Sequence, residues 1–442
     1  MKRLIVAAVA LVVCWSAAAL RAAAPQQQAQ PAPGVPTFNR DVAPILFKNC
    51  TTCHRPGEIA PMSLLTYEDA RPYAKAIRDE VSDGVMPPWH AAAPHGTFLN
   101  ERVLTAAEKD VLVRWANNGA PEGNPKDLPR APEYTDGWQI GKPDAVFEMT
   151  QEYKVPAEGV VQYEYFYIPT NFTEPKWVQA VEVRPGNRAV VHHALVYYRA
   201  KPDLQRTNVL QFNSETARLP QERTAGTRLN APKGDLPPRR LLATYAPGTN
   251  PQIAPAGTAF RLEPGGVIEL QMHYTPTGEA QNDRTKVGFV FARMPNVREV
   301  RASQFVNGQF TLPAGVADVA VDAEVGFLQD TTVWGLFPHT HLRGKRWRYV
   351  LELPDGTKRT ILDVPRYDFN WQTYYMFREP LQLPKGAKII STAWYDNSAA
   401  NRWNPDAKVD VKWGDQTWEE MQYTGILFSP QAAPTTVPEE KK

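Results

Sequence analysis

The chain has few cysteines, and this scarcity limits how its fold is stabilised. Three cysteines occur in 442 residues, and the first of them, Cys14, lies in an N-terminal segment that we expect to be removed. The other two, Cys50 and Cys53, are close neighbours, so they cannot provide the disulfide framework that stabilises small secreted domains. A chain of this length buries enough apolar surface without covalent cross-links. We therefore expect two or three domains, each with its own hydrophobic core.

Long runs of one charge and long apolar runs are also missing after the first residues. The 49 lysines and arginines nearly balance the 47 aspartates and glutamates, so neither nucleic acid nor an anionic membrane is an expected partner. No segment after residue 24 is apolar over the roughly 20 residues that a membrane-spanning helix needs. We therefore expect no membrane span in the mature chain.

Residues 1–24 have the pattern of a secretory signal peptide. A basic start (Lys2, Arg3) is followed by a short apolar stretch and then by small residues. A lipoprotein anchor at Cys14 is an alternative, but Val13 is bulkier than the small residue that such sites prefer. The pattern predicts a periplasmic or secreted protein.

Helical and extended patterns occupy different parts of the chain. Apolar residues have helical spacing in residues 67–82 and 105–118, and Thr105 with Glu108 forms a capping box. Alternation of period two begins near residue 145 and recurs, as in residues 160–168, 177–183, 287–291 and 319–325. Because the 41 prolines and 12 tryptophans are scattered, we expect many short strands joined by stiff turns.

These patterns predict a multidomain protein with a small all-α unit followed by two antiparallel β-sandwiches of jelly-roll type. Proline, glycine and charged residues without periodicity mark the connections between units. The expected parts are a signal peptide (1–24), a flexible leader (25–36), a small helical domain (37–120), a linker (121–144), two sandwiches (145–295 and 296–428) and a tail (429–442).

The two remaining cysteines belong to a haem-attachment motif. Cys50-Thr51-Thr52-Cys53-His54 has the spacing at which two thiols add to the haem vinyl groups while the histidine ligates the iron. A chance match or a zinc role is the alternative. The motif predicts one covalent haem c, and the segment around it is similar to small class-I cytochromes c.

The second ligand of the haem iron must come from elsewhere in the domain. Met86 lies in a proline-stiffened loop after a predicted helix, and a thioether ligand there would raise the haem potential. Met62 is the competing ligand, and either methionine could instead pack in the core. We predict Met86.

Five of the eight histidines fall in three short motifs of the strand region: His192 with His193, His273, and His339 with His341. A lone strand histidine is more often a core or surface residue than a ligand, but close pairs favour metal binding. His339 and His341 are two residues apart, so on a strand their rings share one face. His192 and His193 point to opposite faces of a regular strand, so joint ligation requires a bulge or a strand end.

Imidazoles suit copper, zinc, iron and nickel alike, and a soft ligand would favour copper. A zinc hydrolase is one alternative, but we expect no carboxylate near His339 or His341 to act as general base. The remaining histidines, His90 and His95, have no assigned role and are expected at the surface beside the haem crevice.

The order of these motifs resembles the copper type II, ascorbate-dependent monooxygenases, the family of peptidylglycine α-hydroxylating monooxygenase and dopamine β-monooxygenase. The resemblance covers roughly residues 145–428. It implies two copper ions, each in one β-sandwich, facing each other across a solvent-filled cleft. The implied ligands of the electron-receiving copper are His192, His193 and His273, and those of the oxygen-binding copper are His339, His341 and Met421.

The sequence also departs from the family. Peptide-amidating members hold the substrate carboxylate with an arginine at the position of Phe337, so peptide amidation is not expected. The disulfides of these enzymes are also missing, and aromatic segments such as residues 369–371 are expected to pack the core or line a substrate site. The predicted function is hydroxylation of an organic C–H bond with O2, with the haem relaying electrons from an external donor. The alternative is a non-catalytic haem and copper protein for electron transfer or redox sensing.

Overall fold

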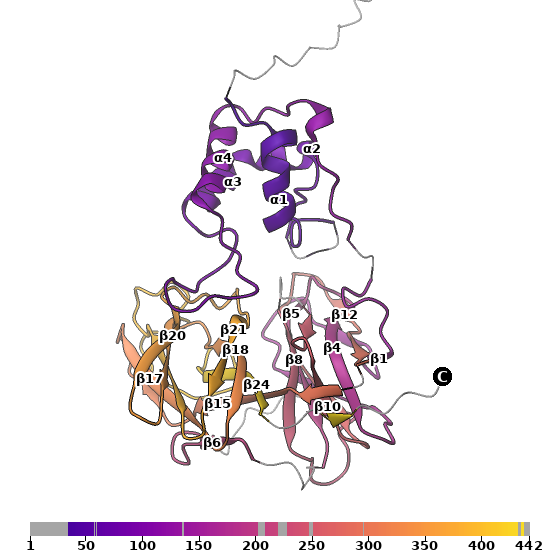
Figure 1. Ribbon diagram of the computed structural model, residues 1–442, viewed down its shortest axis with the longest axis vertical. Helices are drawn as coiled ribbons and strands as arrows, with labels where there is room; N and C mark the ends of the chain where they lie inside the picture. Colours follow the sequence, from indigo (N-terminus) through magenta and orange to yellow (C-terminus); the bar gives the residue numbers. More distant parts are fainter. Residues whose placement is uncertain are drawn as a thin grey trace, which may run out of the picture.

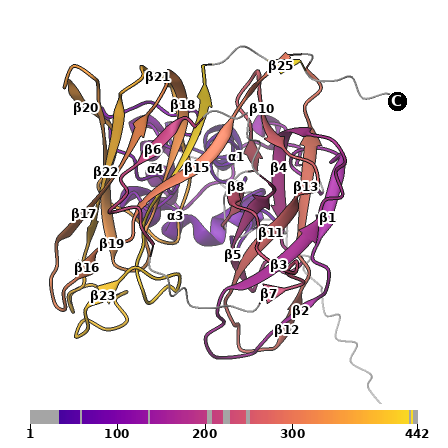
Figure 2. The ribbon, with the colours of Figure 1, turned by 90° about the horizontal axis from the view of Figure 1, so that it is seen from below.

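The computed structural model describes residues 34–56, 58, 60–134, 137–201, 208–219, 228–246, 251–294, 296–431 and 435–436. The predicted signal peptide and most of the leader lie outside these residues. A helical unit sits at one end of two β-sandwiches that lie side by side (Figures 1 and 2). Most of the regular secondary structure in the described chain is β-sheet, as predicted. No helix in the described ranges is long and apolar enough to cross a membrane.

The helical unit contains four α-helices in the described residues: α1 (Ala43–Asn49), α2 (Tyr67–Ala70), α3 (Ala74–Ser82) and α4 (Ala106–Asn117). The predicted capping box at the start of α4 is confirmed, because the Thr105 side chain accepts from the Glu108 N–H and the Glu108 carboxylate accepts from the Thr105 N–H. These short helices are held by their own apolar core, which includes Phe38, Leu46, Leu112 and Trp115.

Two sheets form the N-terminal sandwich, and their inner faces enclose one hydrophobic core. The first sheet contains β1 (Ala145–Glu148), β13 (Lys286–Phe291), β4 (Lys176–Arg184), β10 (Thr258–Leu262), β14 (Asn296–Glu299), β25 (Thr435–Thr436) and β9 (Gln252–Ile253). The second contains β7 (Arg228–Leu229), β3 (Glu164–Pro169), β11 (Val267–Tyr274), β5 (Val191–Arg199) and β8 (Arg239–Tyr245). A separate pair joins β2 (Tyr153–Val155) to β12 (Gln281–Asp283).

The C-terminal sandwich also has two sheets around one core. The first contains β15 (Arg301–Asn307), β24 (Gln422–Pro430), β18 (Thr331–His339) and β21 (Tyr375–Leu383). The second contains β20 (Lys358–Val364), β19 (Gly344–Glu352), β22 (Lys388–Tyr395), β17 (Val319–Phe327) and β6 (Leu210–Phe212). A separate pair joins β16 (Thr311–Leu312) to β23 (Val411–Lys412).

Strands from each half of the chain cross the boundary expected at residue 295. Strand β6 precedes it but pairs with β17 in the C-terminal sandwich, and β25 pairs with β14 in the N-terminal sandwich. Most pairings are antiparallel as predicted, but β10 with β14 and β3 with β7 are parallel. Apolar side chains such as Trp334 and Leu427 of the C-terminal sandwich pack into the N-terminal core. This shared core fixes the two sandwiches against each other.

Residues 89–100, which we call the strap, leave the helical unit and join the C-terminal sandwich. Phe98 forms a bridge with Phe377 and is buried against Trp89 and Tyr375. Backbone hydrogen bonds tie the strap to the same sandwich on both sides of Phe98. The strap therefore packs as part of the sandwich, although the sequence places it in the helical domain.

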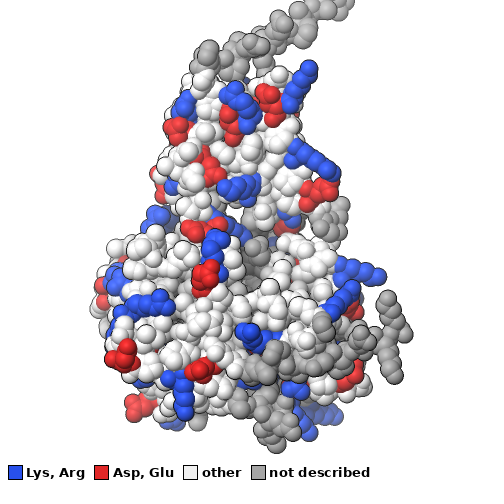
Figure 3. Space-filling view, viewed as in Figure 1, with Lys and Arg blue, Asp and Glu red and all other residues white. Residues whose placement is uncertain are grey.

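The helical unit also contacts the N-terminal sandwich. Arg188, in the turn before β5, forms an ion pair with Glu58, which also pairs with Arg55 at 2.8 Å. The guanidinium of Arg55 lies 3.9 Å from the ring centre of Tyr134 in the connecting segment. Charges of both signs are interspersed on the face seen in Figure 3, in agreement with the balanced composition. The Arg188–Glu58 ion pair therefore holds the helical unit against the N-terminal sandwich.

Candidate metal centres

The first histidine group lies on two neighbouring strands of one sheet. His193 on β5 is directly opposite His273 on β11, whereas the next pair is Val191 with Tyr274. His192 is therefore the extra residue of a β-bulge, which turns its ring toward the other two. The bulge that sequence reasoning required for joint ligation is present.

Three Nδ1 atoms converge at this site. The Nδ1 atom of His193 lies 3.1 Å from that of His192 and 3.3 Å from that of His273. The ligand atoms of all three rings lie within 4.8 Å of one another. Metal–nitrogen bonds of about 2.0–2.1 Å in tetrahedral geometry place neighbouring nitrogens roughly 3.3 Å apart. The three imidazoles are therefore close enough together to bind one transition-metal ion after small adjustments.

The first group is held in the neutral form that ligates metals. Burial lowers the pKa of His273 to about 3. Burial also lowers the pKa of His193, and the neighbouring imidazoles, including those of His339 and His341, lower it further. The Nε2 atom of His193 lies 3.2 Å from the Tyr163 hydroxyl, which fixes the ring. His339 and His341 therefore lie close enough to His193 to affect its pKa.

His339 and His341 lie at the end of β18 and in the turn that follows it. Their ring centres are 5.1 Å apart at an interplanar angle of 83°. The Nδ1 atom of His339 contacts the Gln372 amide oxygen at 2.5 Å, and that of His341 donates to the Glu419 carbonyl at 3.2 Å. The Nε2 atom of His341 is buried and has no hydrogen-bond partner among the described residues. An unpaired buried nitrogen of this kind suits a metal ion.

One carboxylate, that of Glu420, lies directly beside this pair. Glu420 is fully buried, and its oxygens accept from the backbone N–H groups of His341 at 2.7 Å and Arg343 at 2.6 Å. Burial raises the pKa of Glu420 to about 7. Because both carboxylate oxygens of Glu420 accept hydrogen bonds from backbone N–H groups, this residue stabilises the turn and is not positioned as a general base. The sequence feature that could have drawn attention to Glu420 is its place in the Glu419-Glu420-Met421 run.

Met421 directly precedes β24, the strand that pairs with β18. Its carbonyl accepts from the Tyr395 hydroxyl at 2.7 Å, and its side chain is half-buried. Met421 and His339 line the same cavity. The structure therefore brings the expected thioether and one of the expected imidazoles to one cavity wall.

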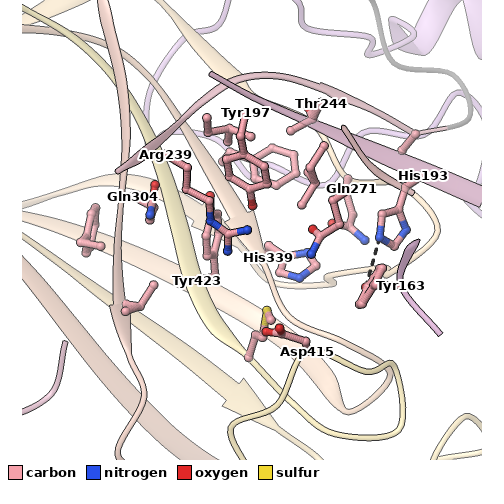
Figure 4. Close-up of a pocket in the computed structure, with 18 of the residues that line it drawn as sticks. Tyr163, His193, Tyr197, Arg239, Thr244, Gln271, Gln304, His339, Asp415 and Tyr423 are labelled. Atoms are coloured by element: carbon pink, nitrogen blue, oxygen red, sulfur yellow. Dashed lines mark hydrogen bonds between the residues drawn. The ribbon is translucent and has the colours of Figure 1, made fainter. Parts of the chain in front are cut away.

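A cavity of about 290 Å³ is lined by residues of both histidine groups. It lies between the sandwiches, and both groups contribute to its wall, as Figure 4 shows for His193 and His339. The wall is mostly apolar, with a small number of polar side chains such as Arg239, Gln271 and Tyr423. This composition is typical of a site for a small organic molecule.

Phe369 links the two groups, a contact that sequence reasoning did not predict. Its ring stacks on His192 with centres 5.6 Å apart and meets the edge of His341 at 6.1 Å. It belongs to the loop between β20 and β21, which also supplies Gln372. Phe369 and Asn370 line the cavity.

A second cavity, of about 540 Å³, lies beside the first histidine group. Its wall combines His192 and His273 with His90 and the 84–85 backbone of the loop after α3. Both ring nitrogens of His90 are buried and have no hydrogen-bond partner in the described part of the chain. His90 is therefore half-buried, whereas the sequence analysis expected it at the surface. The loop that contains Met86 therefore lines the same cavity as two histidines of the first group.

The haem motif forms one turn after α1. The backbone N–H groups of Cys53 and His54 both donate to the Cys50 carbonyl, at 3.1 and 2.9 Å. Both cysteines are free, and burial raises the pKa of the Cys50 thiol to about 12. Burial lowers the pKa of His54, which favours the neutral imidazole that ligates iron. Two thiols and one imidazole on a single turn fit covalent haem attachment.

Both methionines considered as the second iron ligand are half-buried. Met62 packs against the helical core that includes Cys50, whereas Met86 lies in the loop after α3 and donates its N–H to the Glu80 carbonyl at 3.1 Å. The assignment of Met86 stays a prediction.

Comparisons with known proteins do not assign the chain to a family. No protein-family model matches it, and no curated protein is significantly similar. Matches to solved structures include an infectious bursal disease virus structure (8% identity, 66% of this chain and 78% of that chain, TM-score 0.17) and a bacteriophage PM2 spike protein P1 (9%, 62% and 98%, 0.15). A BuGH86 structure with neoagarooctaose gives 12% identity over 60% of this chain and 33% of that chain, with a TM-score of 0.15. These scores are too low to bear on fold or function.

Proposed function

We propose that the protein is an exported copper-dependent monooxygenase that hydroxylates an organic C–H bond, with electrons supplied through a fused c-type haem. The observation that carries the proposal is the cavity shared by two imidazole groups. His192 and His193 of the converging group line this cavity together with His339 and Met421. The histidine order and this arrangement together match the copper type II monooxygenases that the sequence resembles.

The donor sets fit copper at both sites. Three neutral imidazoles at the first site suit a copper ion that changes oxidation state, and a weak thioether from Met421 at the second favours Cu(I), the form that reacts with O2. When bound, the two ions supply one-electron transfer and O2 activation. Hydroxylation consumes the substrate C–H, O2, two electrons and two protons, and it yields C–OH and water.

The protein side chains have distinct tasks in this reaction. The apolar cavity wall excludes water from the reacting C–H bond. Gln372, Glu419 and Glu420 orient His339 and His341, because each accepts a hydrogen bond from a ligand ring or from the turn that holds it. Phe369 closes the space between the two groups.

We further propose that residues 37–120 form a class-I cytochrome c unit whose iron is ligated by His54 and Met86. The loop after α3 lines the second cavity together with His192 and His273, so electrons would reach the first copper site. The contacts of the strap and the Arg188–Glu58 ion pair hold the helical unit against the sandwiches. This supports its proposed role as a docked electron donor. Docking keeps the donor at a high effective concentration beside its acceptor.

Oxygen uptake with an external reductant tests the proposal. We expect the purified protein to contain one haem and two copper ions and to consume O2 when a C–H substrate is present. Met421→Ala should keep the haem and the first copper but lose uptake. Haem without stoichiometric copper would refute the proposal. Uptake in neither protein would favour the alternative of a non-catalytic electron-transfer or redox-sensing protein.

A further inference from the structure

The cavity between the two histidine groups has chemical features that restrict the molecule it binds. Its wall is largely built from aliphatic and aromatic side chains, among them Leu195, Leu219, Leu241, Phe305, Val306 and Phe337. A wall of this kind accepts an apolar body of limited size, because the cavity measures about 290 Å³. The polar groups then decide which head group the molecule carries.

One of these polar groups belongs to a buried cluster with excess positive charge. Glu269 is 1% exposed and forms ion pairs with two arginines, Arg199 and Arg239, the latter at 2.8 Å. Two guanidinium groups share one carboxylate, so the cluster carries one net positive charge. Buried charge is normally compensated by an opposite charge. The cluster is therefore prepared for one further anion.

Arg239 is the member of this cluster that lines the cavity, whereas Arg199 donates to the Pro237 carbonyl at 2.6 Å. Figure 4 shows the guanidinium of Arg239 among the cavity-lining residues, near Tyr197 and Tyr423. Its carbon lies 4.2 Å from the ring centre of Tyr197, which keeps the planar group oriented. The excess charge is thus presented to the cavity.

Tyr423 supplies a further donor to the cavity, and this donor is unsatisfied. Its hydroxyl is buried and has no hydrogen-bond partner among the described residues, although such groups are normally paired. Its ring meets the ring of His339 edge-on with centres 5.8 Å apart. A bound acceptor atom near Arg239 would satisfy this hydroxyl beside the second metal site.

We propose that the substrate is a compact apolar molecule with a single carboxylate, which Arg239 and Tyr423 bind while the apolar body lies against the aliphatic wall. The guanidinium matches the two oxygens of a carboxylate, and the hydroxyl donates to one of them. That the bound molecule is oxidised rests on the proposed function, but its binding does not. Asp415 lines the same cavity, so an amine is the competing ligand class.

Calorimetric titration of the full-length protein tests this assignment with three isosteric probes: cyclohexylacetate, cyclohexylethanol and cyclohexylethylamine. We expect the acid to bind at least tenfold more tightly than the alcohol and the amine, both before and after copper removal with a chelator. In Arg239→Met and in Tyr423→Phe the acid should lose at least tenfold in affinity. Arg199→Lys is the control, because it keeps the charge of the cluster and lies outside the cavity wall, and it should retain the preference.

Equal or tighter binding of the alcohol or the amine would overturn the assignment, as would an equal loss of affinity in Arg199→Lys. Circular dichroism and haem content of each variant establish that it is folded. If the protein binds the acid but holds no copper, the ligand class stands and the proposed function fails. If it holds two copper ions and consumes O2 but prefers the amine, the ligand class fails and the proposed function stands.

Discussion

The two histidine sites differ in how the fold builds them. The first lies on paired strands of one sheet, where a bulge brings three ring nitrogens together. The second begins at the end of β18 and depends on side chains and carbonyls of two loops for its orientation. Sheet positions are held by many backbone hydrogen bonds, whereas loop positions depend on single contacts. The first site is therefore preformed, and the second has more freedom to adjust during a reaction.

Loss of a whole ligand tests whether the two sites are separate. We expect His192→Ala and His339→Ala each to reduce the copper content from two ions to one, because either change leaves the other site complete. Metal analysis after dialysis measures the content, with His95→Ala as a control outside both sites. Unchanged copper in either ligand variant would remove that site from the assignment.

The turn of the second site depends on one buried carboxylate. Glu420→Ala leaves the backbone N–H groups of His341 and Arg343 without acceptors, and each unsatisfied group costs about 1–3 kcal/mol. We expect the free energy of unfolding to fall by about 3 kcal/mol and the second copper to be lost. Chemical denaturation and metal analysis measure both effects. Glu420→Gln keeps one acceptor, so its free energy of unfolding and its copper content should lie between those of Glu420→Ala and the wild type. Retention of both copper ions in Glu420→Ala would show that the second site does not depend on this turn.

Partners of the ligand rings offer a matched comparison between the sites. Gln372 contacts His339, and Tyr163 contacts His193. Loss of such a partner typically lowers metal affinity tenfold to a hundredfold. We expect Gln372→Leu to weaken only the second copper site, and Tyr163→Phe to weaken only the first and by less, because the sheet still holds its histidines. Competition with a copper chelator measures each affinity, and a larger loss in Tyr163→Phe would reverse the comparison.

The scaffold of the first site should have a weak pH dependence of its own. Glu182 on β4 is 4% exposed and accepts from the Ile140 N–H at 3.0 Å, and burial raises its pKa above the ordinary value of 4.5. The native state therefore keeps a proton that the unfolded chain has already lost. Stability should fall as pH rises from 4.5 through the raised pKa. Glu182→Gln should flatten this part of the thermal-stability profile, and an unchanged slope would show that other groups cause it.

Local signals in the sequence predicted many of the elements. Alternation of period two indicated β4, β13 and β17, and the Thr105–Glu108 box marked the start of α4. These signals depend on residues close together in the chain. The hydrogen bonds between the strap and the start of β21 join residues more than 270 positions apart in the sequence. No local pattern reports contacts of this kind, so the sequence analysis assigned the strap to the helical domain.

The sequence by itself determined which residues are candidates for chemistry: the Cys50–His54 motif, five histidines of the strand region and Met421. Only the tertiary structure decided how they meet. The bulge at His192 depends on pairing with β11, and Phe369 lies between the two groups because its loop joins β20 to β21. The excess charge at Arg239 arises from three residues on β5, β8 and β11. The identity of each residue is read directly from the sequence. Its burial, the direction of its side chain and the balance of nearby charges result from long-range packing.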